Sequence, residues 1–219
     1  MSLNVIFDMD GVLFNSEHLF TCAWKFAGEK VGLKNADELS QKTIGESFEN
    51  SKKIWKSAIN NENDFNAVCN YFISYINDHY KDSVPTVKKG VYEILEFLKS
   101  KNAKVALASN SIRSFIDSNL KYAKIENYFQ EIISVEMVEN PKPAPDIYLR
   151  ACSLLGIDPK DSYAIEDSKS GVMAAHAAGC KTILVPDMNP PESITVKCAF
   201  AVYDDLLQVK SDFESEQLK

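Results

Sequence analysis

The chain has 219 residues, of which 45% are hydrophobic and 25% are charged, a composition typical of one or two globular domains and unlike that of a disordered or repeat protein. Its formal net charge of −7 at pH 7 argues against a broad nucleic-acid-binding surface. No run approaches the roughly 18 consecutive apolar residues of a membrane span, and no basic leader precedes an apolar run. We therefore expect a cytoplasmic protein that binds neither nucleic acid nor membrane, and a monomer by default.

The N-terminal third begins with a strand and continues as a helical block. Residues 4–7 form a short apolar run, which predicts a buried strand ending at Asp8. Apolar residues then recur at helical spacing, first around 19–31 and later around 65–76. Shorter helices are expected at 36–42 and 46–59. We interpret residues 16–83 as an all-helical cap domain inserted after the first strand.

Strands and helices alternate in the remainder of the chain. This alternation predicts an α/β fold, a Rossmann-like parallel sheet with helices on both faces. Residues 1–15 and 84–219 would then form one discontinuous core domain. The expected strands are 104–108, 132–134, 162–165, 182–185 and 199–202, and the expected helices are 91–98, 112–121, 146–155 and 168–178.

Polar side chains follow several of these strands directly. Ligands bind beyond the carboxyl ends of the strands in an open parallel sheet, so these side chains are expected to converge on one site. Taken singly, residues 8–11 are as typical of a turn as of a site, residues 109–111 are more typical of a helix N-cap, residues 166–168 are also typical of a helix start, and Lys142 is more typical of a solvated loop. Together they place four carboxylates, one lysine and several hydroxyls at one edge: Asp8, Asp10, Ser109, Asn110, Ser111, Lys142, Glu166 and Asp167.

Four neighbouring carboxylates cannot all stay ionised without nearby positive charge. Lys142 supplies one charge, which is not enough. A hard divalent cation with oxygen ligands is the natural complement, and Mg²⁺ suits a site that also accepts phosphate oxygens. The hydroxyls and helix-start N–H groups of residues 109–111 offer an anion cradle. The combination favours phosphoryl transfer.

Four segments also match known motifs, in order and spacing. They are residues 7–13, Ser109 after an apolar strand, Lys142 within 142–146, and residues 166–168 followed by Gly171. On these motifs the chain resembles the haloacid dehalogenase-like (HAD) hydrolase superfamily. Within it, the chain is most similar to the branch of beta-phosphoglucomutase-like and phosphoglycolate-phosphatase-like enzymes with a small helical cap.

The resemblance implies a role for each motif residue. Asp8 would be the nucleophile that forms an aspartyl-phosphate, and Asp10 would be the general acid and base. Mg²⁺ would be held by Asp8, the Asp10 backbone carbonyl and Asp167, with Glu166 beside it. The catalytic and substrate-binding residues of the core would further include Ser109 and Lys142, with Asn110 contacting substrate. Candidate substrate contacts in the cap are His18, Glu46, Ser47 and Lys53.

The favoured function is that of a Mg²⁺-dependent phosphatase acting on a small phosphorylated metabolite, such as a sugar phosphate. A beta-phosphoglucomutase-type phosphomutase is the alternative. Residues 15–83 contain no arginine to grip a second phosphate, and Phe20 stands where the mutase pattern has a histidine. Both departures favour the phosphatase. A non-catalytic protein that binds phosphate ligands on the same fold is the second alternative.

Overall fold

A computed structural model describes residues 3–44, 48–59, 61–82, 86–187 and 190–216. The chain divides into two units. One joins Met1–Asn15 to Thr86–Lys219, and the other is Ser16–Pro85. None of the helices in the described ranges is both long and apolar enough to cross a membrane.

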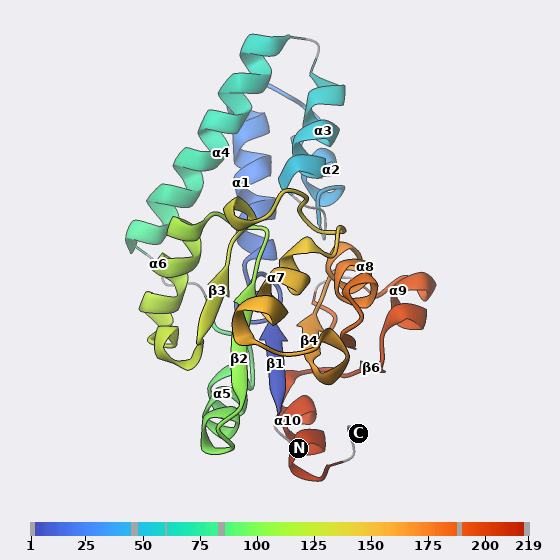
Figure 1. Cartoon of the computed structure of the whole chain (residues 1–219). Coiled ribbons are helices and arrows are strands. Elements are labelled where there is room, and N and C mark those ends of the chain that lie inside the picture. The colour runs from blue at the N-terminus through green and yellow to red at the C-terminus, as the bar shows by residue number, and fades with distance from the viewer. Residues whose placement is uncertain (1–2, 45–47, 60, 83–85, 188–189, 217–219) are drawn as a thin grey trace. The chain divides into compact units, whose positions relative to one another are not determined.

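The first unit is built on a parallel sheet of six strands in the order β3-β2-β1-β4-β5-β6 (Figure 1). Strand β1 therefore lies between two parallel neighbours, and its carboxyl end is flanked by theirs. This confirms the predicted Rossmann-like core. The strands are β1 (Asn4–Phe7), β2 (Lys104–Ala108), β3 (Glu131–Ile133), β4 (Tyr163–Glu166), β5 (Lys181–Leu184) and β6 (Ala201–Val202).

Helices cover both faces of this sheet, because alternate side chains of each strand point to opposite faces. Val5 and Phe7 pack into one apolar cluster with α5, α6 and α10, whereas Ile6 packs into a second with α7 and α8. Burial on both faces explains why the strands are continuous apolar runs. The helices are α5 (Val91–Ser100), α6 (Arg113–Ala123), α7 (Asp146–Leu155), α8 (Lys169–Ala178), α9 (Ser193–Cys198) and α10 (Leu206–Glu214), with 3₁₀ turns η1 (Glu126–Tyr128), η2 (Val135–Met137) and η3 (Pro159–Asp161).

The second unit consists of α1 (Glu17–Lys30), α2 (Ala36–Gln41), α3 (Phe48–Ala58) and α4 (Glu62–Asp82). Its core is aromatic. The ring of Trp24 lies 4.3 Å from that of Phe72 and 5.4 Å from that of Trp55, measured between centroids. Both tryptophans are fully buried. They therefore stabilise the helical unit.

The two chain segments that lead into and out of the helical unit pair with each other within the first unit. The Asn15 N–H donates to the Thr86 carbonyl at 2.9 Å, and the Lys88 N–H donates to the Leu13 carbonyl at 2.9 Å. Phe14 also forms an isolated antiparallel bridge with Val87. The insertion thus begins and ends at neighbouring points of the core.

Some elements differ from the sequence prediction. No helix was expected after residue 178, yet α9 and α10 are present, and α10 is anchored by buried Leu206, Val209 and Phe213. Strand β6 has two residues instead of the expected four.

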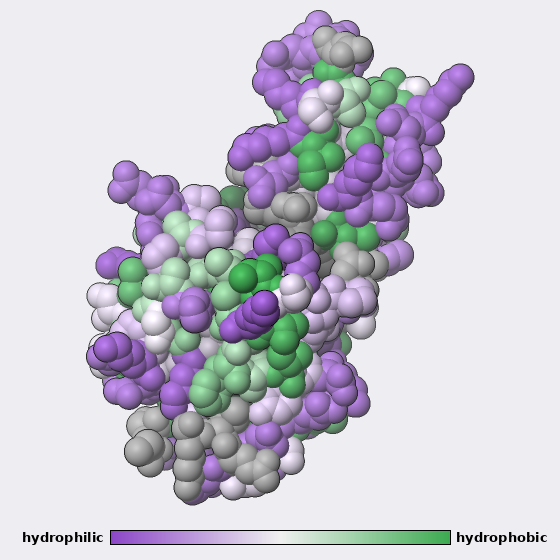
Figure 2. Space-filling model, turned by 90° about the vertical axis from the view of Figure 1, so that its right-hand side faces the viewer, coloured by the Kyte–Doolittle hydropathy of each residue, from purple (hydrophilic) through white to green (hydrophobic). Residues whose placement is uncertain are grey.

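Apolar side chains reach the surface around β6, the last strand of the sheet. The face shown in Figure 2 carries hydrophobic patches among hydrophilic ones. The exposed apolar side chains of α9, β6 and the link between them are Ile194, Val196, Phe200 and Val202.

Candidate active site

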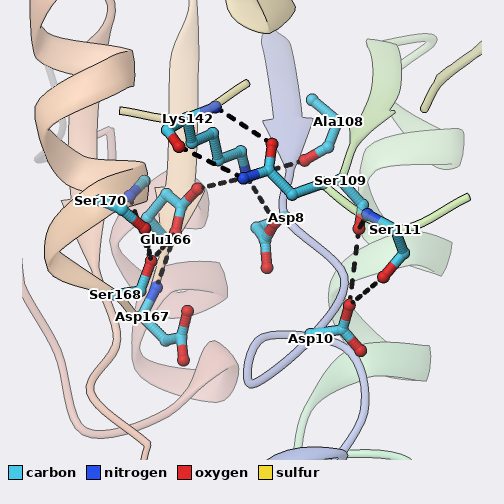
Figure 3. A network of polar contacts seen from close by, with 12 residues as sticks. Asp8, Asp10, Ala108, Ser109, Ser111, Lys142, Glu166, Asp167, Ser168 and Ser170 are labelled. Atoms are coloured by element: carbon cyan, nitrogen blue, oxygen red, sulfur yellow. Dashed lines mark hydrogen bonds and ion pairs between the residues drawn. The ribbon is translucent and has the colours of Figure 1, made fainter. Parts of the chain in front are cut away.

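The register of the sheet brings the predicted site residues together. Phe7 pairs with Leu107 of β2 and with Ile165 of β4. The next residue of β1 is Asp8, whose N–H donates to the Ile165 carbonyl at 2.9 Å. Asp8 therefore lies beside Glu166, the last residue of β4, at the carboxyl edge of the sheet (Figure 3).

Lys142 is buried at this edge, with 5% of its surface exposed. Its ammonium Nζ donates to a carboxylate oxygen of Asp8, to Glu166 Oε1 at 2.6 Å and to the Ala108 carbonyl at 2.9 Å (Figure 3). It also lies 5.1 Å from the ring centroid of Tyr148. One buried cation thus bridges the ends of β1, β2 and β4.

The loop that carries Lys142 is fixed by Asn110. The Lys142 N–H donates to Asn110 Oδ1 at 3.1 Å, and Asn110 Nδ2 donates back to the Lys142 carbonyl at 3.4 Å. The Lys142–Pro143 peptide bond is cis. Asn110 therefore positions Lys142 in this structure, and its predicted contact with substrate stays a prediction.

A group of three acids could hold a metal ion. Among the described residues, Asp8, Glu166 and Asp167 each offer one carboxylate oxygen, and these oxygens lie within 4.8 Å of one another. Several carboxylate oxygens at one point are the donor set that hard divalent cations such as Mg²⁺ prefer. The residues present therefore fit a magnesium ion.

Two glycines allow these acids to lie where they do. A Cβ atom on Gly11, whose φ is +84°, would lie 2.0 Å from Asp167 Oδ2. A Cβ atom on Gly171 would lie 1.9 Å from the carboxyl carbon of Glu166. Any larger residue would displace one of the acids, so both glycines are required for this packing.

Burial and charge perturb the ionisation of the site. Burial is the main reason that the pKa of Asp8 rises to about 8, and the Glu166 and Asp10 carboxylates raise it further while the Lys142 ammonium lowers it. The charges of Asp8 and Glu166 outweigh burial at Lys142 and raise its pKa. Lys142 thus stays protonated, while Asp8 needs further positive charge to ionise fully at neutral pH.

Asp10 is held apart from the three-acid group. Its Oδ2 accepts a hydrogen bond from Ser111 Oγ at 2.8 Å and a longer one from Ser109 Oγ at 3.5 Å. The Ser111 N–H donates to Ser109 Oγ at 3.0 Å. Ser109 and Ser111, which follow β2, therefore hold the Asp10 carboxylate by hydrogen bonds.

The predicted cap residues are only partly described. His18 is exposed, and its Nε2 lies 3.7 Å from Cys22 Sγ. Lys53 is exposed and its Nζ donates to Asn50 Oδ1 at 3.3 Å. Glu46 and Ser47 lie outside the described residues. The assignment of these four residues to substrate binding stays a prediction.

Tyr148 is a site residue that the sequence analysis missed. Its hydroxyl donates to Glu166 Oε1, the oxygen that also accepts from Lys142. Burial and the nearby Glu166 carboxylate raise the pKa of Tyr148 well above its ordinary value, so the phenol stays protonated as a donor. In the sequence, Tyr148 is one apolar position of the helix 146–155, and that spacing indicates only burial.

Comparison with known proteins agrees with this site. A family model described as haloacid dehalogenase-like hydrolase matches residues 5–185, which include every core residue of the site. The chain belongs to this hydrolase family. It is thus an enzyme of a family that the motif resemblance predicted, and that prediction is confirmed.

Relatives of the hydrolase carry several functional names. A phosphorylated carbohydrates phosphatase of Thermotoga maritima is 33% identical over 203 residues, covering 90% of this chain and 92% of the relative. A beta-phosphoglucomutase of Bacillus subtilis is 28% identical over 192 residues, covering 85% and 84%. The crystal structure of a beta-phosphoglucomutase from Clostridium difficile superposes with a TM-score of 0.75 at 25% identity, covering 99% and 97%.

Proposed function

We propose that this hydrolase is a Mg²⁺-dependent phosphatase that cleaves a small phosphate monoester, such as a sugar phosphate, through an aspartyl-phosphate on Asp8. One observation carries the proposal. The Asp8 carboxylate pairs with the buried ammonium of Lys142, which also pairs with Glu166, and one Asp8 oxygen lies within 4.8 Å of oxygens of two further carboxylates, Glu166 and Asp167. A nucleophile in this setting can meet an anionic phosphoryl group only where fixed cations offset the repulsion.

The residues divide the reaction into two steps. In the first, an Asp8 oxygen attacks phosphorus, the ester P–O bond breaks, and the leaving oxygen takes a proton from Asp10. In the second, Asp10 accepts a proton from water, the water oxygen attacks phosphorus, and the bond to Asp8 breaks to release inorganic phosphate. Ser109 and Lys142 bind the phosphoryl oxygens in both steps.

The proposed metal ligands are the carboxylates of Asp8, Glu166 and Asp167, together with the backbone carbonyl of Asp10. Bound Mg²⁺ supplies positive charge that favours the ionised form of a carboxylate and offsets phosphate charge. The raised pKa of Asp8, about 8, is consistent with a site that needs such a cation.

The inserted helices would select the substrate. In this proposal residues 16–83 act as the cap of a core formed by 1–15 and 84–219, and His18, Glu46, Ser47 and Lys53 contact the substrate. Closure of a cap excludes bulk water from the reacting groups. We also infer a monomer in the cytoplasm whose partner is a small phosphorylated metabolite.

The relatives support a phosphatase first and a mutase second. The Thermotoga relative is named for phosphorylated carbohydrates, and residues 15–83 of this chain contain no arginine for a second phosphate. The beta-phosphoglucomutase relatives keep the phosphomutase as the second candidate. The phosphatase and the phosphomutase would use the same nucleophile and differ in their products, so one set of product assays distinguishes them.

The test is a panel of phosphate monoesters, assayed for released phosphate with Mg²⁺ and with a chelator. We expect turnover that needs the metal and that disappears in Asp8→Asn, which keeps the shape of the side chain. Turnover that survives in Asp8→Asn would refute the assigned nucleophile. Isomerisation of glucose 1-phosphate in the presence of a hexose bisphosphate, without net phosphate release, would instead establish the mutase. Binding without turnover would establish the non-catalytic alternative.

A further inference from the structure

The Asp10 carboxylate has a defined partner in the core. Ser111 Oγ donates to Asp10 Oδ2 at 2.8 Å, the usual length of a bond between two oxygens. Ser109 Oγ lies 3.5 Å from the same oxygen, at the outer limit of a hydrogen bond. The two serines are therefore not equivalent, and Ser111 makes the effective contact (Figure 3).

Ser109 also acts as an acceptor in this loop. Its Oγ accepts the Ser111 N–H at 3.0 Å, and its side chain is almost fully buried. This bond fixes the backbone of Ser111 and so aims the Ser111 hydroxyl. Ser109 follows β2 directly, as expected for the phosphoryl-binding residue, whereas Ser111 lies two residues further, toward Asp10.

The segments that carry the two partners are both anchored. The Ser109 N–H donates to the Ile133 carbonyl at 3.0 Å, and the Ser111 carbonyl accepts from the Val135 N–H at 3.3 Å. On the other side, the Gly11 N–H donates to the Phe14 carbonyl at 2.9 Å. Neither segment needs to rearrange for the contact, so the bond can hold the carboxylate in a set orientation.

We propose that Ser111 is a positioning residue that orients the Asp10 carboxylate for proton transfer to the leaving oxygen. The proposal rests on the function proposed above and adds a residue to it. A hydroxyl that donates to Oδ2 fixes the plane of the carboxyl group and directs the transferable proton to the other oxygen, Oδ1. Proton donation depends on such alignment, because the donor must lie within hydrogen-bond reach of the atom it protonates.

Two aryl phosphates separate this role from a structural one. p-Nitrophenolate is a weak base that leaves without a proton, whereas the phenolate of phenyl phosphate is more basic and leaves more easily when protonated. Misorientation of Asp10 should therefore slow phenyl phosphate more than p-nitrophenyl phosphate. The quantity to compare is kcat/KM, because it reports only the steps up to formation of the phosphoenzyme and excludes its hydrolysis.

The experiment measures kcat/KM for both esters in the Mg²⁺-loaded wild type and in the variants Ser111→Ala, Ser111→Thr and Ser109→Ala. In Ser111→Ala the loss on phenyl phosphate should exceed the loss on p-nitrophenyl phosphate about tenfold, the effect of one hydrogen bond to a charged group. Ser111→Thr keeps the hydroxyl and should restore most of the difference. Ser109→Ala removes a phosphoryl contact, which should slow both esters, and it also removes the acceptor of the Ser111 N–H, so part of the same difference between the esters should appear in it.

Equal losses on the two esters in Ser111→Ala, or no recovery in Ser111→Thr when circular dichroism shows both variants folded, would overturn the positioning role. Absence of turnover in the wild type, or turnover retained by Asp8→Asn, would overturn the proposed function and this inference with it. If Ser111→Ala does not fold, the ratio between the two esters is read from Ser111→Gly, with the same expected selectivity. The failure of the inference and the failure of the function therefore give different results.

Discussion

Replacement of Lys142 by Met tests the electrostatics of the site. Met keeps the length of the side chain and removes the ammonium that bonds to Asp8, to Glu166 and to the Ala108 carbonyl. Breaking a buried ion pair costs about 3–5 kcal/mol, because the remaining charge stays buried without a partner. The ion pairs of Lys142 with Asp8 and with Glu166 share one ammonium, so their costs do not add in full. Asp8 can also take up a proton in the variant, which limits the cost of leaving it without a partner. We therefore expect the free energy of unfolding to fall by about 3–5 kcal/mol at pH 9.

The loss of unfolding free energy in Lys142→Met should depend on pH, and the raised pKa of Asp8 determines whether the loss grows or shrinks as the pH rises. An acid whose pKa is higher in the folded than in the unfolded protein stabilises the fold fully below the unfolded pKa, and this contribution is lost as the pH rises through the folded pKa. For Asp8 that window runs from 3.8 to about 8 in the metal-free protein. Lys142 lowers the folded pKa, so its removal raises it further. Below pH 8 Asp8 is mostly protonated in both folded proteins, so the deficit of the variant should change little there, and it should grow above pH 8, where only the wild type ionises Asp8.

The assay is urea unfolding of the metal-free protein, followed by circular dichroism at pH 6 and pH 9. Lys121→Met is the matched control, since Lys121 is exposed on α6 and Lys and Met have similar helix propensities. The control should stay within about 0.5 kcal/mol of wild type. A Lys142→Met deficit below about 1 kcal/mol at pH 9, or one that is no larger at pH 9 than at pH 6, would refute the reasoning.

Three further predictions concern single contacts. Tyr148→Phe keeps the ring and removes the donor to Glu166, so the free energy of unfolding should fall by about 1–3 kcal/mol in urea titration; no change would mean that the hydroxyl is not needed there. Gly171→Ala places a Cβ 1.9 Å from the Glu166 carboxyl carbon, so the rise in Tm on adding Mg²⁺ should shrink, and an undiminished rise would contradict the proposed metal ligands. Asp205→Ala removes the cap of α10 and the exposed pair with Lys89, and should cost about 1–2 kcal/mol at pH 7. Because these contacts lower the pKa of Asp205, its contribution is present above the unfolded pKa and is lost as the pH falls through the folded pKa; a cost in urea that does not shrink in acid would contradict this account.

The convergence of the motif residues could be predicted because it depends on topology. Parallel strands place their carboxyl ends at one edge, so Asp8, Ser109 and Glu166 had to meet once their segments were recognised as neighbouring strands. The identity of each contact could not be predicted in the same way. Asn110 bonds to the backbone of Lys142, a residue 32 positions away in the sequence, and such pairings depend on how loops pack in three dimensions.

Other differences reflect weak local signals. Helix α9 has six residues, too few for a clear apolar period. Helix α10 carries Leu206, Val209 and Phe213 at helical spacing, a signal that was present and not used. Tyr148 has an apolar ring that fits the core pattern of α7, so its sequence position gave no indication of the hydroxyl's bond to Glu166.

The hydrogen-bonded chain segments at Asn15 and Thr86 have a consequence for how the protein can evolve. Because the chain leaves and re-enters the core at hydrogen-bonded neighbours, everything between them can be lengthened, shortened or exchanged while the sheet keeps its register. If the inserted helices select the substrate, as proposed, substitutions there can change specificity without altering the catalytic groups of the core, so the two properties can evolve independently.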